Sequence, residues 1–234
     1  MVTEALNASD RRTVGRVLRD NGLSLTLTVL FIVFIVGQAL AGQRHYNEEQ
    51  IEHGQPTVSL SEYVSSGPFW SATAENWESE FLQMAAYALF TVFLFQRGSA
   101  ESKKIGESEP VDRDPKLSRN KRNAPWPVRR GGWVLALYSN SLSLAFVLLF
   151  LISFGLHAVG GTAAHNEEEL THGGHTVTVL EYMHSSQFWF ESFQNWQSEF
   201  LSLAVMVVFS IFLRQRSSPE SKPVDAPHSE TGSG

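Results

Sequence analysis

Glutamate and histidine stand four residues apart at two places in the chain, Glu49 with His53 and Glu168 with His172. Residues four apart share one face of a helix, so each pair could offer a carboxylate oxygen and an imidazole nitrogen to one ion. Zinc and manganese use such ligands. The spacing predicts a divalent metal site if the two pairs converge. The simpler alternative is that each Glu and His stabilises the opposite ends of a short helix.

A second set of ionisable and amide side chains stands next to apolar runs. The segment Asn-Trp-x-Ser-Glu-Phe occurs twice, and a single histidine interrupts another apolar run. Ionisable groups at the edge of a membrane are costly, and paired carboxylates could bind a cation or share a proton. The alternative is that these side chains are hydrated, or form hydrogen bonds that join helices and loops. The predicted ion or proton-binding residues are Asn76, Glu80, Asn195, Glu199 and His157.

Four apolar runs must position these residues: Leu23 to Leu40, Phe81 to Gln96, Leu142 to Gly161 and Phe200 to Leu213. A helix needs about 20 mostly apolar residues to cross a bilayer, so the first and third runs qualify directly. The second and fourth runs are shorter, but each follows a Trp and ends in Arg, which extends the reach of a helix. The patterns predict an all-α integral membrane protein with four transmembrane helices.

The chain repeats itself with an offset of 119 residues. Aligned without gaps, residues 21–103 and 140–222 are identical at 36 of 83 positions, which is far above chance. Each copy contains two predicted spans, so the copies would form two parallel hairpins. A signal-peptide reading of the first run is disfavoured because its counterpart lies in mid-chain. The predicted segments are 1–20, unit 21–103, linker 104–139, unit 140–222 and tail 223–234.

Basic residues are distributed very unevenly around the predicted spans. Seventeen of the 18 Lys and Arg residues lie before Leu23, between the second and third spans, or after the fourth, and only Arg44 lies in a long loop. Basic residues flanking spans stay in the cytoplasm, so both termini and the linker are predicted there. The tail and the basic linker are predicted to be disordered or loosely held against anionic lipid. No nucleic-acid partner is expected.

The two outer loops, Gln43 to Glu80 and Thr162 to Glu199, carry capping signals for short helices. Asn47 with Gln50, and Asn166 with Glu169, resemble capping boxes that would start one helix in each loop. A further box follows in each loop, and a third helix is expected to begin near Ser66 or Ser186 and to continue into the second span of its unit. These second boxes pair Ser59 with Glu62 and Thr178 with Glu181.

The paired Asn-Glu-Glu, His-Gly, Phe-Trp and Asn-Trp-x-Ser-Glu-Phe motifs, each set closing with Gln-Arg-x-Ser-x-Glu-Ser-Lys, resemble an uncharacterised bacterial family with a domain of unknown function. The likeness extends from Leu18 to Lys222. It implies a bacterial cytoplasmic (inner) membrane location and no particular activity.

Composition narrows the function further. The absence of cysteine excludes disulfides, thiolate metal sites and cysteine nucleophiles. No phosphate-binding glycine-rich loop or nucleophile elbow is present. The leading expectation is a non-enzymatic accessory, sensing or scaffolding protein, which could form homo- or hetero-oligomers. The alternatives are a small cation or proton transporter or channel subunit that uses Glu80 and Glu199, and a metal-dependent membrane enzyme that uses the Glu/His pairs.

Overall fold

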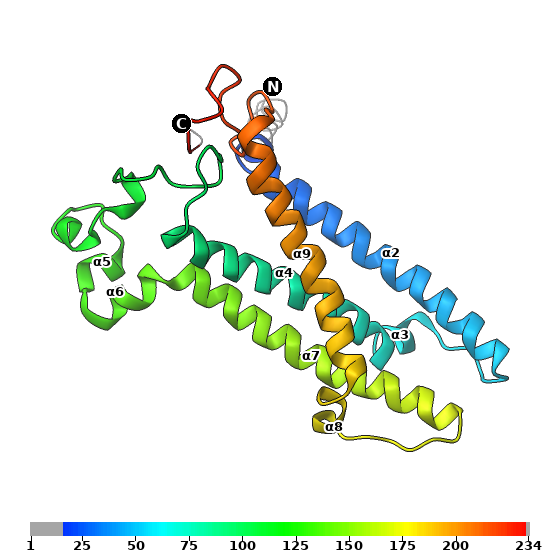
Figure 1. Cartoon of the computed structure of the whole chain (residues 1–234). Helices are drawn as coiled ribbons and strands as arrows, with labels where there is room; N and C mark the ends of the chain where they lie inside the picture. Colours follow the sequence, from blue (N-terminus) through cyan, green and yellow to red (C-terminus); the bar gives the residue numbers. More distant parts are fainter. Residues whose placement is uncertain (1–15, 233–234) are drawn as a thin grey trace, which may run out of the picture. The chain divides into compact units, whose positions relative to one another are not determined.

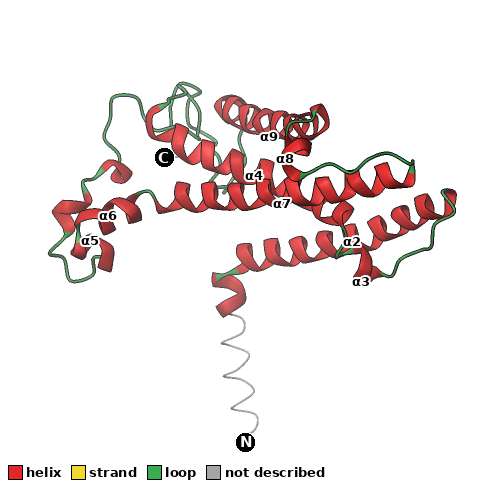
Figure 2. Ribbon diagram, turned by 90° about the horizontal axis from the view of Figure 1, so that it is seen from below, coloured by secondary structure: helices red, strands yellow, loops and turns green. Residues whose placement is uncertain are grey.

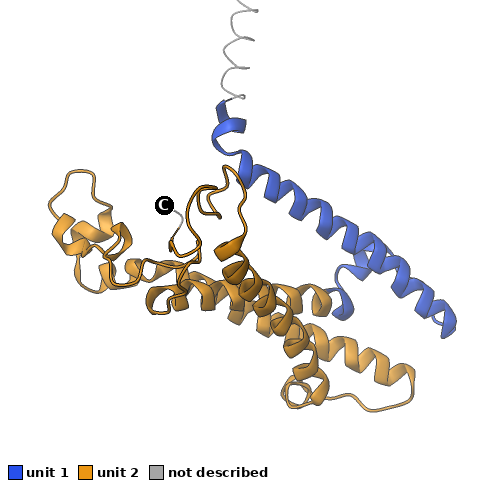
Figure 3. Cartoon of the chain, turned by 45° about the horizontal axis from the view of Figure 1, so that its top comes forward, with its two compact units in different colours: residues 1–69 blue, residues 70–234 orange. Residues whose placement is uncertain are grey.

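The computed structural model describes residues 16–232, and within this range the chain forms helices and connecting loops without any strand (Figure 2). Most of the predicted segment 1–20 and the last two residues of the tail lie outside the described residues. The chain divides into two compact units, the first ending at Phe69 and the second beginning at Trp70 (Figure 3). The fold is therefore all-helical, as predicted.

The first unit contains α2 (Gly22–Glu52), α3 (Leu60–Tyr63) and the first residues of α4 (Gly67–Phe93). The prediction of a separate helix starting at Asn47 is wrong, because α2 continues through this position to Glu52. The Asn47 amide instead accepts a hydrogen bond from the Val58 backbone N–H and donates one to the Val58 carbonyl. It therefore fastens the returning loop to α2 and does not cap a new helix.

The second unit contains the rest of α4, then α7 (Ser141–Thr171), α8 (Val179–Met183) and α9 (Ser186–Phe212) (Figure 1). The prediction of a helix start at Asn166 is wrong for the same reason as in the first unit. The Asn166 amide bonds both backbone groups of Val177 while α7 runs on to Thr171.

The second capping boxes are confirmed in both loops. The Ser59 hydroxyl accepts from the Glu62 N–H, and Glu62 accepts from the Ser59 N–H, at the start of α3. Thr178 and Glu181 make the same reciprocal pair at the start of α8. The predicted long helices that follow are also confirmed, since α4 and α9 begin at Gly67 and Ser186 and run for 27 residues each.

Three helices in the described part of the chain are long and apolar enough to cross a membrane: α2, α7 and α9. The protein is therefore suited to a lipid bilayer. Helix α4 contains most of the predicted span Phe81 to Gln96, but it ends at Phe93 and its first half carries Glu75, Glu78 and Glu80. Among the described residues, α4 therefore has no apolar stretch as long as those of α2, α7 and α9.

The segment between α4 and α7 holds four short helices: η1 (Pro110–Asp112), η2 (Pro115–Ser118), α5 (Trp126–Arg130) and α6 (Gly132–Ser139). The tail also makes specific contacts, in contrast to the disorder that its composition predicts. The buried Lys222 ammonium donates to the carbonyl oxygens of Gly98, His228 and Glu230, at 2.6, 3.1 and 2.8 Å. A buried ammonium needs such partners, and here they order the chain around it.

Helices α4, α7 and α9 pack together through buried aromatic and small residues. Phe188 of α9 is fully buried and contacts Tyr182 of α8 and Ala158 of α7. The ring of His157 stacks on Phe188, with centroids 4.7 Å apart and planes 27° apart. This packing places a histidine at the meeting point of three helices.

Candidate metal centre

His157 lies in α7 with its side chain completely shielded from solvent. Its Nδ1 is 2.8 Å from Oε2 of Glu78, whose side chain is also completely buried. The other oxygen of Glu78 accepts a hydrogen bond of 2.8 Å from the indole N–H of Trp196. Because Glu78 has two N–H partners, it serves as a buried acceptor that orients the imidazole ring.

The opposite nitrogen of His157 faces two more carboxylates. Its Nε2 lies 3.3 Å from Oε2 of Glu191 and 3.9 Å from Oε2 of Glu75. Glu75, His157 and Glu191 each present one ligand atom, and these three atoms all lie within 4.8 Å of one another. The arrangement could therefore hold one metal ion between a nitrogen and two carboxylate oxygens.

Neutral donors hold Glu191 in place. The Tyr182 hydroxyl donates to Oε2 of Glu191 at 2.7 Å, and the Gln187 amide donates to its other oxygen at 3.1 Å. The Asn195 side-chain amide donates to the backbone carbonyl of Glu191 at 3.1 Å. Burial raises the pKa of Tyr182 well above its ordinary value, so this hydroxyl remains a donor at neutral pH.

Helix geometry explains how these residues meet. Glu75 and Glu78 are three apart on α4 and therefore share one face. Glu191 stands early in α9, one turn after Phe188, so the same packing that buries Phe188 brings Glu191 to His157. Gly161 lets Tyr182 approach α7, because a Cβ at this position would come 2.6 Å from the Tyr182 ring.

The centre has more negative than positive partners. Three carboxylates surround one imidazole, and in the described part of the chain no Lys or Arg forms an ion pair with any of them. Even a protonated histidine would balance only one of three ionised carboxylates. Uncompensated charge is expensive away from water, so this site favours either a bound cation or a protonated carboxyl.

One side of the centre is accessible. The side chains of Glu75 and Glu191 are 23% and 25% exposed, whereas those of His157 and Glu78 are fully buried. An ion could therefore reach the two carboxylates first and the imidazole last.

Of the residues predicted from the sequence, the structure brings His157 and Asn195 to this centre. Asn76 instead bonds within its own helix to the Ala72 carbonyl. Glu80 is exposed and Glu199 half-buried, and the two are close enough for their charges to interact. The backbone carbonyl of Glu199 accepts a hydrogen bond from Gln83, which links α4 to α9.

The two predicted Glu/His pairs have the geometry of helix ends. Nδ1 of His53 lies 2.8 Å from the Glu49 carbonyl oxygen, and Nδ1 of His172 lies 2.9 Å from that of Glu168. Each histidine therefore bonds the last turn of its helix. The capping alternative holds for the histidines alone, because Glu49 and Glu168 lie in that same last turn and not at the start of a short helix. The pairs belong to different units of the chain.

Sequence reasoning missed Glu75, Glu78 and Glu191 because it searched for residues that recur after 119 positions. The corresponding residues are Gln194, Gln197 and Ala72. His157 also lacks a counterpart, since the matching residue is Gln38. The signal that could have found them is the difference between the two copies. Each of these acidic residues lies close to an apolar run and has a non-acidic residue at the corresponding position of the other copy.

The model of a family described as a domain of unknown function (DUF6766) matches residues 14–233. The chain belongs to this family. The assignment agrees with the resemblance drawn from the paired motifs, and it carries no activity. Neither the comparison with curated proteins nor the comparison with solved structures gave a match.

Proposed function

We propose that this DUF6766 protein is a bacterial inner-membrane protein that binds a divalent transition-metal ion through Glu75, His157 and Glu191, in a non-enzymatic sensing or accessory role. The observation that carries the proposal is the unbalanced charge around His157, where three carboxylates and no Lys or Arg surround one buried imidazole. A bound divalent cation would neutralise two carboxylates directly.

The spacing of the ligand atoms supports a small ion. Ligands at about 2.0–2.1 Å from zinc, at tetrahedral angles, are about 3.3 Å apart. Nε2 of His157 lies 3.3 Å from Glu191 and 3.9 Å from Glu75, so a modest movement of Glu75 would complete the geometry. The three residues leave room in the coordination sphere for water or a further ligand.

The donor types favour one class of metal over another. An imidazole nitrogen with two carboxylates suits Zn²⁺, Mn²⁺ or Fe²⁺, whereas Mg²⁺ and Ca²⁺ prefer oxygen ligands alone. Glu78 supports this assignment, because a ligand histidine usually donates its other ring N–H to a carboxylate. The hydrogen bond between Nδ1 and Glu78 leaves Nε2 free to bind metal.

The proposal includes the topology predicted from the sequence. Four spans, with α4 crossing the bilayer in addition to α2, α7 and α9, would form two parallel hairpins with both termini in the cytoplasm. The matching lengths of α2 and α7, 31 residues each, and of α4 and α9, 27 each, support the duplication. The centre would then lie near the outer surface, where an extracytoplasmic ion could enter.

Equilibrium dialysis of the full-length protein in detergent, followed by elemental analysis, tests the proposal. One equivalent of Zn²⁺ or Mn²⁺ is expected, with Mg²⁺ and Ca²⁺ bound much more weakly. Glu191→Gln should abolish this binding, and Glu78→Gln should weaken it about 10- to 100-fold, as is typical for a residue that orients a ligand.

Glu199→Gln is the matched control, because it removes a carboxylate from the same helix without touching the centre. It should leave the metal affinity unchanged. Absence of bound metal in the wild-type protein would overturn the proposal. Equal losses in Glu191→Gln and Glu199→Gln would show that the ion binds elsewhere, which also contradicts it.

A further inference from the structure

The segment from Arg113 to Trp133, called the basic platform below, is strongly charged and exposed. It contains seven basic residues against one acidic residue, Asp114. All seven basic side chains are exposed, and within the described residues none of them forms an ion pair with a carboxylate. The seven are Arg113, Lys116, Arg119, Lys121, Arg122, Arg129 and Arg130.

The platform has a folded backbone. The Arg119 guanidinium donates to the backbone carbonyls of Arg129 and Arg130, which holds η2 against α5. Gly131 has a φ of 71°, a left-handed conformation that suits glycine, and it makes the bend between α5 and α6. Val128 and Leu135 are buried at this bend. The basic side chains are therefore displayed from a defined scaffold.

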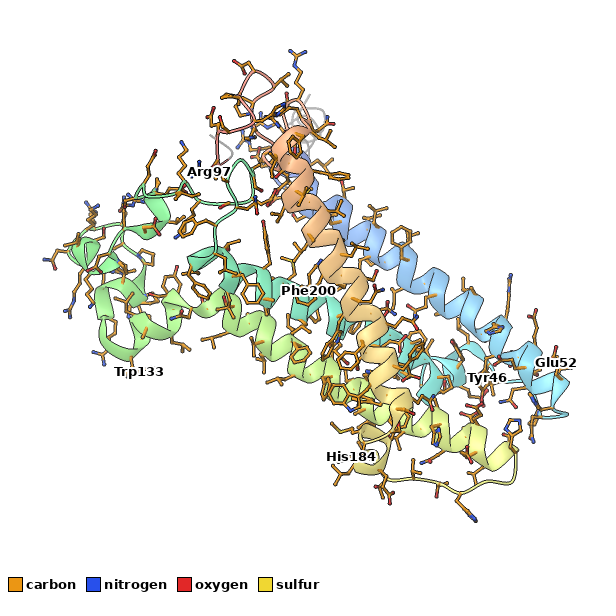
Figure 4. The ribbon with its side chains drawn as sticks, viewed as in Figure 1. Tyr46, Glu52, Arg97, Trp133, His184 and Phe200 are labelled. Atoms are coloured by element: carbon orange, nitrogen blue, oxygen red, sulfur yellow. The ribbon has the colours of Figure 1, made fainter. Side chains whose placement is uncertain are left out.

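Large apolar side chains stand beside these charges. Trp133 is 76% exposed at the start of α6 and projects away from the neighbouring helices (Figure 4), and Trp126 is 61% exposed. Leu117 is 84% exposed on η2. Exposed tryptophans next to basic residues are typical of segments that lie at the headgroup level of a bilayer.

The position of the platform in the chain selects its partner. Trp133 precedes the first residue of α7 by eight positions, or about 12 Å if the path is helical. If α7 crosses the bilayer, as proposed above, the platform cannot leave the membrane surface. The nearest abundant negative charges are then lipid phosphates.

We infer that the basic platform is a binding surface for anionic lipid headgroups, with Lys121, Arg122, Arg129 and Arg130 contacting phosphates and with Trp126 and Trp133 inserted at the interface. The inference rests on the proposed membrane insertion but is independent of the metal centre. Arg119 has the different role of holding the platform together.

Native mass spectrometry of the full-length protein, with phosphatidylglycerol or phosphatidylcholine added, tests this inference. The wild-type protein is expected to retain phosphatidylglycerol preferentially. Replacing Lys121, Arg122 and Arg130 together by Gln should reduce that preference by about fivefold for each charge removed. Trp133→Ala should lower retention of both lipids without changing the preference.

The matched control replaces three other exposed basic residues, Arg16, Arg19 and Arg44, by Gln, which changes the net charge equally. This control should keep most of the preference. Equal losses in both triple variants would show a net-charge effect and overturn the assignment to the platform. Displacement of the lipid by inorganic phosphate or by duplex DNA would also overturn it.

The two proposals fail in different ways. Recovery of the chain from cells without detergent would contradict membrane insertion and would remove both. A protein that requires detergent but shows no preference for phosphatidylglycerol would contradict the lipid inference alone. Circular dichroism and thermal unfolding, measured in the same preparation, confirm that each platform variant is folded.

Discussion

The loops that follow α2 and α7 have the same local construction but surround different side chains. In both loops, an Asn near the end of the long helix accepts a hydrogen bond from the backbone N–H of a Val in the returning segment. A capping box then starts the short helix. In both, a Tyr from the short helix presses on a Gly of the long helix. The second loop covers His157, and the position 119 residues earlier is Gln38.

This difference separates architecture from chemistry. The shared contacts use backbone groups, glycine and the ring of tyrosine, which serve to fix the loop. The ionisable residues of the centre are not shared, because Glu191 has Ala72 as its counterpart and Glu75 has Gln194. The comparison teaches that both copies have the same loop architecture, whereas only the second copy has the charged centre beside its loop.

The largest effect is expected for His157→Gln, which gives the second long helix the residue of the first. Glu78 would lose its imidazole partner while remaining completely buried. Removal of one member of a buried pair typically costs about 3 to 5 kcal/mol. Denaturant unfolding in detergent, followed by tryptophan fluorescence, measures the change. An unchanged free energy of unfolding would contradict a stabilising role for the His157–Glu78 pair.

Tyr182→Phe should have the next largest effect. It removes the hydroxyl that donates to Glu191 at 2.7 Å, and a hydrogen bond to a charged group contributes about 1.5 to 3 kcal/mol. Tyr63→Phe is the matched variant, since among the described residues the Tyr63 hydroxyl has no such bond to a carboxylate. Thermal unfolding should show a clear difference between the two, and equal losses would contradict the assigned role of Glu191.

Gly161→Ala and Gly42→Ala test the shared part of the comparison. A Cβ at Gly161 would come 2.6 Å from the Tyr182 ring, and a Cβ at Gly42 would clash with Tyr63. Overpacking of this kind costs about 1 to 3 kcal/mol. Both variants should lose similar stability in the same unfolding assay. Tolerance at one position alone would show that the loops are not equivalent.

The smallest effect concerns pH and should again be equal in the two loops. The backbone N–H groups of Ser59 and Thr178 hold the pKa of Glu62 and Glu181 below the ordinary value of 4.5. A lowered folded pKa stabilises the helix above that ordinary value, and the stabilisation is lost as pH falls through the lowered pKa. Protection factors for hydrogen exchange at residues 60–64 and 179–184, which are corrected for the intrinsic exchange rate, should therefore fall below about pH 4.5.

Glu62→Gln and Glu181→Gln serve as controls for this pH effect. Each variant should abolish the pH dependence in its own loop and leave the other loop unchanged. Protection factors that stay constant between about pH 3 and pH 6 in the wild-type protein would contradict the role of the capping boxes.

Local sequence signals predicted the local structure well. The capping pairs Ser59–Glu62 and Thr178–Glu181 lie within four residues of each other, so the sequence itself contains both partners. The starts of α4 and α9 were predictable for the same reason. The predicted capping boxes at Asn47 and Asn166 were wrong because each Asn side chain bonds a Val 11 residues away. Neighbouring residues alone do not show whether an Asn caps a helix or bonds a distant backbone group.

By itself, the sequence determined that this protein is helical, that apolar runs suit it to a bilayer, and that it belongs to a family with paired motifs. Only the tertiary structure decided which acids meet His157, since Glu78 and Glu191 lie 79 and 34 residues from it along the chain. Apolar periodicity reports which face of a helix is buried. It does not report which face of another helix packs against it, and that pairing creates the centre.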